Sequence, residues 1–179
     1  MVNVFFCDVK KFVLDALELN VCASRKEYLD SITDLKRQNQ SLLVWRLLEY
    51  VLKKYYDFLL VDATVNNDGK WSVKDFIGDF SLAHSDNIVA VAIAPNSVGV
   101  DVEKVTKKIL KLSKKYGSEN EKELTRIWTE RESKIKANSS HLIVKNYDVK
   151  DENGYDYVLS VACKNDEICL NKIDLKEII

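Results

Sequence analysis

Two carboxylates alternate along one short segment of the chain. Asp101 and Glu103 stand in the run VGVDVE, in which valines fill the intervening positions. Residues two apart on a strand point to the same face, so both carboxylates would share one side of a strand. At about 6 Å and an effective dielectric constant of about 20, the two charges repel by about 2–3 kcal/mol, which a divalent cation would turn into attraction. The pair predicts an oxygen-rich Mg²⁺ site, with a merely acidic, water-facing strand as the alternative.

A second feature is a stripe on a predicted helix. Trp128, Glu132 and Lys136 in WTERESKIKA follow one another at a spacing of four residues, which places them on one helix face. An exposed ion pair worth about 0.3–0.5 kcal/mol would explain the two charges, but a purely solvated face does not need a tryptophan. The flank that we expect to be buried consists of Leu124, Ile127 and Ile135.

A third feature is the dipeptide His84-Ser85 in FSLAHSD, directly after a strand-like run. We expect both residues in the turn at the end of that strand, where Ser85 could also cap the turn. A lone histidine is more often structural than functional. Adjacent strand residues point apart, so the dipeptide is a poor nucleophile–base pair for a hydrolase.

Taken in order, FSLAHSD, VGVDVE and WTERESKIKA resemble the signatures of the 4′-phosphopantetheinyl transferase superfamily, in its two-lobe, surfactin-synthetase-activating type. DLKRQNQSLLVWRLLEYVL resembles the N-terminal helix of these enzymes, and DGKW resembles their Gly-Lys-Pro element. The resemblance is clear from about residue 34 to residue 137. It implies transfer of 4′-phosphopantetheine from coenzyme A to a serine of an apo acyl or peptidyl carrier protein. The reaction would need Mg²⁺ and release adenosine 3′,5′-bisphosphate.

The resemblance also assigns roles to individual residues. It makes three carboxylates the magnesium ligands, namely Asp101, Glu103 and Glu132. Near the metal, Glu132 could also take the proton of the acceptor serine, directly or through a water. The residues that would contact coenzyme A are Lys70, His84, Ser85, Arg131, Lys136 and Arg37. Gln40 is an alternative match for Arg37 and would leave that charge missing.

Four positions depart from the family pattern. Ala83 replaces a serine and Ser81 an asparagine, so a coenzyme contact near His84 is expected to be lost or made by the backbone alone. Trp71 replaces a proline and is expected to loosen the turn that carries the lysine. Arg131 replaces a lysine, which keeps the charge but exchanges a compact ammonium for a planar fork.

Two other functions compete with the transferase. Asp101 with Glu132-Ser-Lys134 can be read as the D…ExK pattern of a Mg²⁺-dependent nuclease, but that pattern needs ExK on a strand and this segment is strongly helical. The net charge of −1 also provides no general field for nucleic acid. The other alternative is a degenerate carrier-protein binder without turnover. Clustered carboxylates disfavour it, because they cost stability when no cation is bound.

The elements that must position these residues indicate an α+β fold. The 179 residues suffice for one phosphopantetheinyl transferase domain of two similar half-lobes, a pseudo-dimer with lobes of about 1–97 and 98–179 and the active site between them. Such a chain would act as a monomer. We predict strands at 2–8, within 80–102, at 155–164 and at 167–173, and helices at 34–56, 105–117 and 118–137, with Ser118 as the N-cap of the last. A turn at 65–72 is expected to separate the helical half from the rest.

Composition excludes several classes of protein. Five glycines and one proline leave no glycine-rich phosphate loop of either common type. The spacing of the two histidines and four cysteines does not fit a structural zinc site, and we expect the thiols to be reduced core residues. The start lacks the features of a signal peptide, and no run of 18 apolar residues follows, so we expect a cytoplasmic protein without contact to membrane or nucleic acid.

Overall fold

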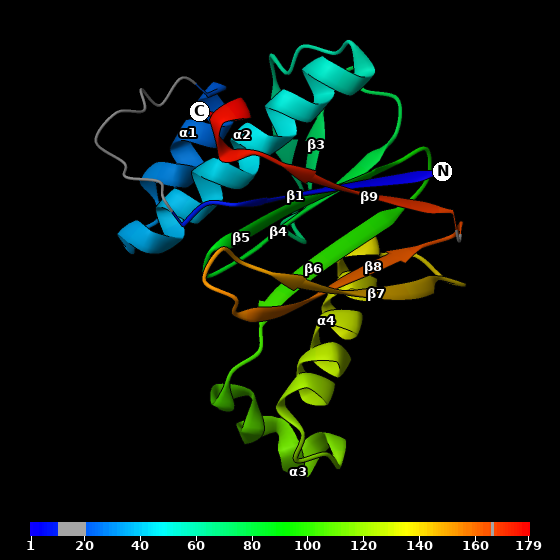
Figure 1. The fold of residues 1–179 in the computed structure, drawn as a ribbon. Coiled ribbons are helices and arrows are strands. Elements are labelled where there is room, and N and C mark those ends of the chain that lie inside the picture. Colours follow the sequence, from blue (N-terminus) through cyan, green and yellow to red (C-terminus); the bar gives the residue numbers. More distant parts are fainter. Residues whose placement is uncertain (11–20, 166) are drawn as a thin grey trace.

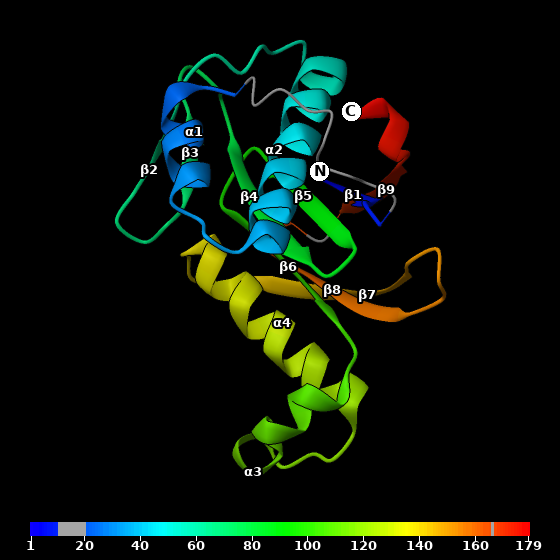
Figure 2. The same ribbon diagram turned by 90° about the vertical axis from the view of Figure 1, so that its left-hand side faces the viewer.

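The computed structural model describes residues 1–10, 21–165 and 167–179. Two β-sheets form its centre, and a long helix covers the outer face of each sheet (Figures 1 and 2). One hydrophobic cluster fills the space between the first sheet and its helix, and a second cluster joins the two sheets. The architecture is mixed α and β, as expected for an α+β fold, and residues 11–20 of the expected N-terminal lobe lie outside the described residues.

The first sheet has four strands in the order β4-β5-β1-β9. Their bounds are Asp79–Ser85 for β4, Ile88–Ala94 for β5, Val2–Asp8 for β1 and Ile168–Ile173 for β9. β1 pairs antiparallel with β5 and parallel with β9. Alternate residues of β1 and β5 enter the two hydrophobic clusters, so the sheet is apolar on both faces. The predicted strands at 2–8 and 167–173 are confirmed.

The second sheet has three antiparallel strands in the order β6-β8-β7. Their bounds are Val98–Lys104 for β6, Asp156–Cys163 for β8 and Ile143–Lys150 for β7. Val98, Val100 and Val102 of β6 pack against the first sheet. Asp101 and Glu103 therefore face the opposite side, as the alternation predicts. None of the predicted strands corresponds to β7.

The helix α2 (Leu35–Tyr56) covers the first sheet and confirms the helix predicted at 34–56. Its N-cap is Asp34, whose carboxylate accepts a 2.7 Å hydrogen bond from the amide of Arg37. Asp57, with φ of 50°, ends the helix in the left-handed conformation. The buried face includes Trp45, Leu48 and other apolar residues of the first hydrophobic cluster. This packing fixes α2 on the sheet that carries β4.

The helix α4 (Glu121–Ala137) covers the second sheet and begins at a different cap from the one predicted. Asn120, not Ser118, accepts the hydrogen bond from the amide of Glu123, while the Ser118 hydroxyl donates to the Glu123 side chain. Acidic residues in the first turn, Glu121 and Glu123, are confirmed and favour the positive end of the helix dipole.

A stripe of small side chains lets α4 approach the second sheet closely. The buried residues are Leu124 and the series Thr125, Thr129, Ser133 and Ala137. Facing them on β6 is Gly99, where an added Cβ would lie 1.9 Å from the carbonyl oxygen of Ser133. The expected buried flank is therefore wrong in part. Leu124 is buried, but Ile135 is 57% exposed.

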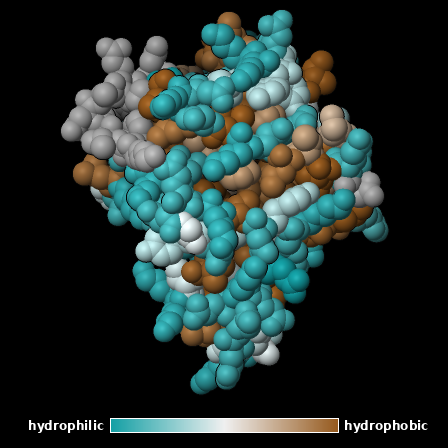
Figure 3. Space-filling model, in the orientation of Figure 1, coloured by the Kyte–Doolittle hydropathy of each residue, from teal (hydrophilic) through white to brown (hydrophobic). Residues whose placement is uncertain are grey.

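The segment predicted as a helix at 105–117 is less regular. It consists of the 3₁₀ helix η2 (Lys107–Leu112) and the four-residue α3 (Ser113–Tyr116), which ends at Gly117 with φ of 70°. Neither piece has a buried residue, and lysines four apart repel each other, so little stabilises a regular α-helix here. The surface around this end of the molecule is largely hydrophilic (Figure 3).

The remaining elements are short. They are α1 (Ala23–Asp30), the hairpin of β2 (Ala63–Val65) and β3 (Trp71–Val73), and η3 (Leu175–Glu177). The turn predicted at 65–72 is thus the tip of a hairpin, rather than a boundary between two halves. A tight turn at Gly154, with φ of 79°, joins β7 to β8.

The C-terminal strand lies in the sheet of the N-terminal half. β9 belongs by sequence to the lobe expected at 98–179, yet it pairs with β1 of the lobe expected at 1–97. One strand of the expected C-terminal lobe therefore completes the sheet of the expected N-terminal lobe, and the division into lobes stays a prediction.

One of the four cysteines, which were all expected to be core residues, lies on the surface. Cys7 and Cys163 are buried and Cys22 is half-buried, but Cys169 is exposed, because it points outward from the edge strand β9. Among the helices that the structure describes, none is both long and apolar enough to cross a membrane.

Candidate active site

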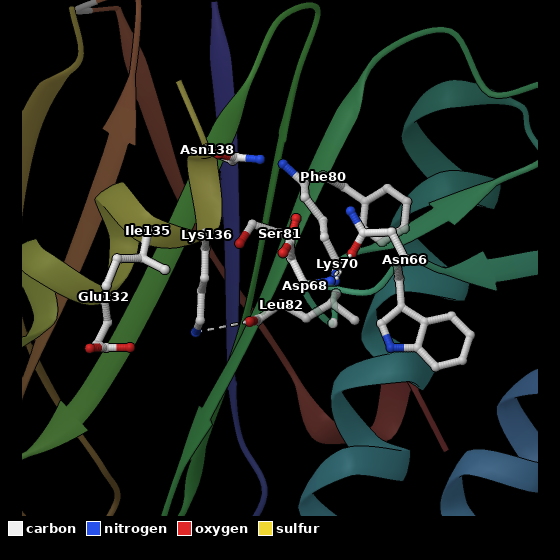
Figure 4. A pocket seen from close by; sticks show the side chains of 12 residues that line it. Asn66, Asp68, Lys70, Phe80, Ser81, Leu82, Glu132, Ile135, Lys136 and Asn138 are labelled. Atoms are coloured by element: carbon white, nitrogen blue, oxygen red, sulfur yellow. Dashed lines mark hydrogen bonds between the residues drawn. The ribbon is translucent and has the colours of Figure 1, made fainter. Parts of the chain in front are cut away.

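A cavity of about 530 Å³ lies between the β2–β3 turn, β4 and the C-terminal half of α4. Lys70 reaches it from the turn, and Glu132 and Lys136 reach it from α4 (Figure 4). Three of the predicted site residues thus border the same cavity, although Lys70 precedes Glu132 and Lys136 by 62 or more positions in the sequence. Its volume falls in the range typical of small-molecule sites, about 300–1,000 Å³.

A tight turn positions Lys70. The side-chain oxygen of Asn66 accepts hydrogen bonds from the amides of Asp68 and Lys70, and Gly69 takes a φ of 78° that few other residues adopt. The ammonium of Lys70 donates to the Asp79 carboxylate and, at 3.3 Å, to the carbonyl oxygen of Val98. Lys70 is therefore held toward β4 and β6.

The neighbouring Trp71 anchors this turn instead of loosening it. Its ring is 8% exposed and packs edge-on against Trp45 and Tyr28, with ring centroids 5.1 Å and 5.6 Å apart. The buried guanidinium of Arg25 lies 5.0 Å from the Trp71 ring, a favourable cation–π distance. The expectation that Trp71 loosens the turn is wrong, because the indole is buried against the rings of Trp45 and Tyr28.

Lys136 joins the two sheets at the centre of the site. Its ammonium donates to Asp101 Oδ1 at 2.7 Å, to the carbonyl oxygen of Val100 at 3.1 Å and to that of Leu82 at 3.2 Å. Val100 and Leu82 belong to β6 and β4, so one side chain of α4 bridges both strands. An ammonium has three hydrogens, and each of them has an acceptor here.

Asp101 is a buried carboxylate with an incomplete set of partners. The residue is 7% exposed, and its Oδ2 atom has no hydrogen-bond partner among the described residues. Burial raises the pKa of Asp101, the ammonium of Lys136 opposes this rise, and the charge of Glu132 adds to it. An unpartnered buried carboxylate oxygen is a candidate cation ligand.

Glu103 lies two residues further along β6. Burial raises the pKa of Glu103, a hydrogen bond from Ser85 lowers it, and the charges of Asp101 and Glu132 raise it. The charge of Glu132 on α4 therefore acts on both carboxylates of β6. As they stand, however, no group of three or more His, Cys, Asp or Glu side chains in the described part of the chain is arranged to hold a metal ion. The oxygen donors fit Mg²⁺ in kind, with Asp101 and Glu103 as the adjacent pair.

Side chains of β4 bind the backbone of β6 at regular intervals. Three polar residues on the inner face of β4 accept hydrogen bonds from backbone amides of β6, each 19 positions later. The pairs are Asp79 with Val98 at 2.8 Å, Ser81 with Val100 at 3.0 Å and Ser85 with Lys104 at 3.2 Å. Ala83 occupies the remaining position of this alternation and has no oxygen to offer. We call these contacts the β4–β6 seam.

His84 and Ser85 belong to β4 itself rather than to the turn after it. His84 points away from the inner face that carries Ser85. Burial, followed by repulsion from Lys136, Arg37 and Arg25, lowers the pKa of His84 to about 4. The imidazole is thus neutral at pH 7, and without a bound anion it would act as a hydrogen-bonding group rather than a cation.

We expect His84 to titrate near pH 4 in the folded protein, compared with about 6.5 in the unfolded chain. Since the unfolded state takes up the proton first, the free energy of unfolding should fall as the pH drops from about 6.5 toward 4. NMR of the imidazole protons and urea unfolding at several pH values would measure both effects. In His84→Gln the titrating signal should vanish and the loss of stability over this range should shrink; an unaltered pH profile would contradict the assignment.

The two predicted arginines lie further out. Arg131 is exposed on α4 and donates to the Tyr116 hydroxyl at 3.1 Å. Arg37 is exposed at the start of α2, close enough for its charge to lower the pKa of His84. Gln40, the alternative match, donates to the carbonyl oxygen of Asp86 at 2.7 Å. Arg37 thus remains on the side of α2 near β4, and Arg131 lies toward α3.

A second cavity, of about 420 Å³, opens beside Glu103. Trp128, which the helical stripe singled out, contributes to its apolar lining with Ile109 and Leu112 of η2. Lysines border it, namely Lys104, Lys108 and Lys111. The predicted stripe on α4 is therefore divided. Glu132 and Lys136 face the first cavity, whereas Trp128 faces the second.

Sequence reasoning missed Asp79, which binds both Lys70 and the amide of Val98. The alternation of polar residues at 79, 81 and 85 marks a polar strand face in the sequence, but the binding of this face to β6 amides is visible only in the structure. The nuclease alternative loses support, because Glu132 and Lys134 lie in the helix α4 and not on a strand.

No family model matches the chain. A protein named 4′-phosphopantetheinyl transferase gsp, from Aneurinibacillus migulanus, is 27% identical to it over 149 residues. This chain is similar to a phosphopantetheinyl transferase. The match covers 73% of the chain but 61% of the relative's own length. The likeness supports a transferase of this superfamily and agrees with the resemblance of the three motifs.

Proposed function

We propose that this protein transfers 4′-phosphopantetheine from coenzyme A to a serine hydroxyl of an apo acyl or peptidyl carrier protein. The reaction would require Mg²⁺ and release adenosine 3′,5′-bisphosphate. The observation that carries the proposal is the cavity bordered by Lys70, Lys136 and Glu132, with the unpartnered oxygen of Asp101 behind it. Cationic and carboxylate groups from distant segments meet there, as a metal-assisted phosphoryl-type transfer requires.

Coenzyme A would bind through its phosphates. Lys70 and Lys136 supply the positive charge at the cavity, and their ammonium groups would exchange part of their present carbonyl and carboxylate contacts for phosphate oxygens. His84 would contribute a hydrogen bond. Arg37 and Arg131, both exposed, would add charge at the periphery.

The proposed magnesium ligands are Asp101, Glu103 and Glu132. Bound there, Mg²⁺ would withdraw charge from the attacked phosphorus and stabilise the leaving group. Asp101 is suited to the role because its Oδ2 atom is buried and unpartnered within the described residues. Glu132 on α4 would accept the proton of the acceptor serine, directly or through a water molecule.

The carrier protein would approach from the side of the second cavity. That cavity adjoins Glu103 and combines apolar residues, Trp128 and Leu112, with a lysine border. Such a surface suits a partner with an apolar contact face and acidic side chains. A serine presented there would approach Glu103, one of the proposed metal ligands.

We also propose the two-lobe arrangement with a monomer as the active form. The β2–β3 turn, β4 and α4, which border the cavity, come from one chain, so the proposed site needs no second copy. Each lobe would contribute the long helix and most strands of one sheet, and β9 of the C-terminal lobe would complete the sheet of the N-terminal lobe.

Intact-mass spectrometry tests the function directly. A panel of apo acyl and peptidyl carrier proteins is incubated with coenzyme A, Mg²⁺ and this protein, and at least one carrier should gain the mass of a phosphopantetheine group. Omission of Mg²⁺ with added chelator should abolish the gain. A carrier whose acceptor serine is replaced by alanine is the matched control.

A panel without any gain in mass would contradict the transferase and favour the non-catalytic carrier binder. If a carrier gains mass even in the presence of chelator, the proposed transfer would be supported, but its proposed dependence on Mg²⁺ would be wrong.

A further inference from the structure

The Ser85 hydroxyl makes two contacts at the end of the β4–β6 seam. It donates to Glu103 Oε2 at 2.6 Å and accepts from the amide of Lys104 at 3.2 Å. A serine hydroxyl has a single hydrogen to donate, and the Glu103 carboxylate takes it. In this arrangement Ser85 has no hydrogen left for a phosphate oxygen.

Ser81 provides a matched comparison within the same strand. It lies four residues earlier on the same face of β4 and accepts from the amide of Val100 at 3.0 Å, as Ser85 does from Lys104. The Ser81 hydroxyl binds a backbone amide, whereas the Ser85 hydroxyl binds both a backbone amide and a carboxylate. The two serines therefore share the seam contact and differ in the carboxylate contact.

We infer that Ser85 is a positioning residue for Glu103, holding that carboxylate in place for the divalent cation, rather than a contact of coenzyme A. The inference deepens the proposed function and rests on its metal site. Glu103 has several rotatable bonds and lies beside the charge of Asp101, so an unrestrained side chain would turn away from its neighbour. A charge-assisted hydrogen bond at 2.6 Å restrains the position of one carboxylate oxygen and so limits the rotation of the side chain.

Residues that hydrogen-bond a metal ligand typically change metal affinity by about 10–100-fold when they are removed. Mn²⁺ is a suitable probe, because it shares the preference of Mg²⁺ for oxygen ligands and its free ion gives an electron paramagnetic resonance signal. Titration of the full-length chain with Mn²⁺ measures binding without turnover, and it is carried out with and without coenzyme A.

We expect Ser85→Ala to weaken Mn²⁺ binding about 10-fold, and Ser85→Thr, which retains the hydroxyl, to stay within about 2-fold of the unmodified protein. Ser81→Ala loses an equivalent seam contact and should also stay within about 2-fold. Circular dichroism establishes that each variant is folded. If Ser85→Ala does not fold, Ser85→Val and Ser85→Thr give the same comparison, because they have nearly equal shapes and differ in the hydroxyl.

Equal affinities of the Ser85→Ala and Ser81→Ala variants would overturn the role of Ser85 and leave the transferase untouched. If the unmodified protein does not bind Mn²⁺ either with or without coenzyme A, the proposed metal site and the proposed role of Ser85 are both wrong. If the Mn²⁺ series behaves as expected but no carrier gains mass, the transferase fails and the positioning role of Ser85 stands.

Discussion

Replacement of Asp101 by asparagine should reduce the rate of carrier modification about 10³-fold or more while leaving the protein folded. The change keeps the shape of the side chain and removes the charge that the proposed metal site needs. Stability should change little, because two effects oppose each other. The ion pair with Lys136 is lost, but a buried carboxylate whose pKa is raised by desolvation no longer has to be kept charged.

Intact-mass time courses measure the rate, and urea unfolding measures the stability. Asp148→Asn is the matched control, since Asp148 pairs with Lys122 at 2.7 Å on the same sheet but its side chain is 65% exposed. The control should modify carriers at the normal rate. Comparable rates for the two variants would remove Asp101 from the proposed metal site.

The second large effect is expected at Gly99. Replacement by alanine should lower the free energy of unfolding by about 3 kcal/mol or more, at the upper end of what overpacking costs. The added Cβ would lie 1.9 Å from the carbonyl oxygen of Ser133 and 2.6 Å from the amide nitrogen of Ala137. Both are backbone atoms of α4, so the helix must move away from β6 as a whole. Carrier modification should fall too, because α4 carries Glu132 and Lys136.

Chemical unfolding and mass spectrometry measure these two effects. Gly154→Ala serves as the control, because its Cβ would meet nothing within 4 Å and the cost is confined to the positive φ of 79°. That cost is about 1 kcal/mol. A loss of stability at Gly99 no larger than this would show that α4 does not pack on β6 as described.

Local patterns predicted the elements that have a strong period. Helix α2 has buried residues at helical spacing along its length, and the strands of 80–102 are rich in β-branched residues bounded by turns. β7 was missed because it is an edge strand in which half of the residues are polar and a single residue is buried, so its apolar pattern is weak. The region of η2 and α3 looked more helical than it is, since lysine has a good helix propensity but nothing there is buried.

The sequence allowed the residues of the candidate site to be predicted, but it revealed less about how these residues are arranged in space. Asp101 and Glu103 share a face because alternation on a strand is a local rule. The meeting of Lys70, Glu132 and Lys136 depends on long-range packing and became an expectation through the family resemblance alone. The role of Asp79 depends on β4 lying along β6, which no local pattern reports.

The parallel pairing of β9 with β1 has a consequence for synthesis. Val2 lies opposite Ile168, so the sheet that contains β4 cannot be completed until the chain has been synthesised as far as β9 and this strand has left the ribosome. Contacts of such high sequence separation are slow to form. The apolar edge of β1 would be exposed to other nascent chains in the meantime, a period during which a chaperone would be of use.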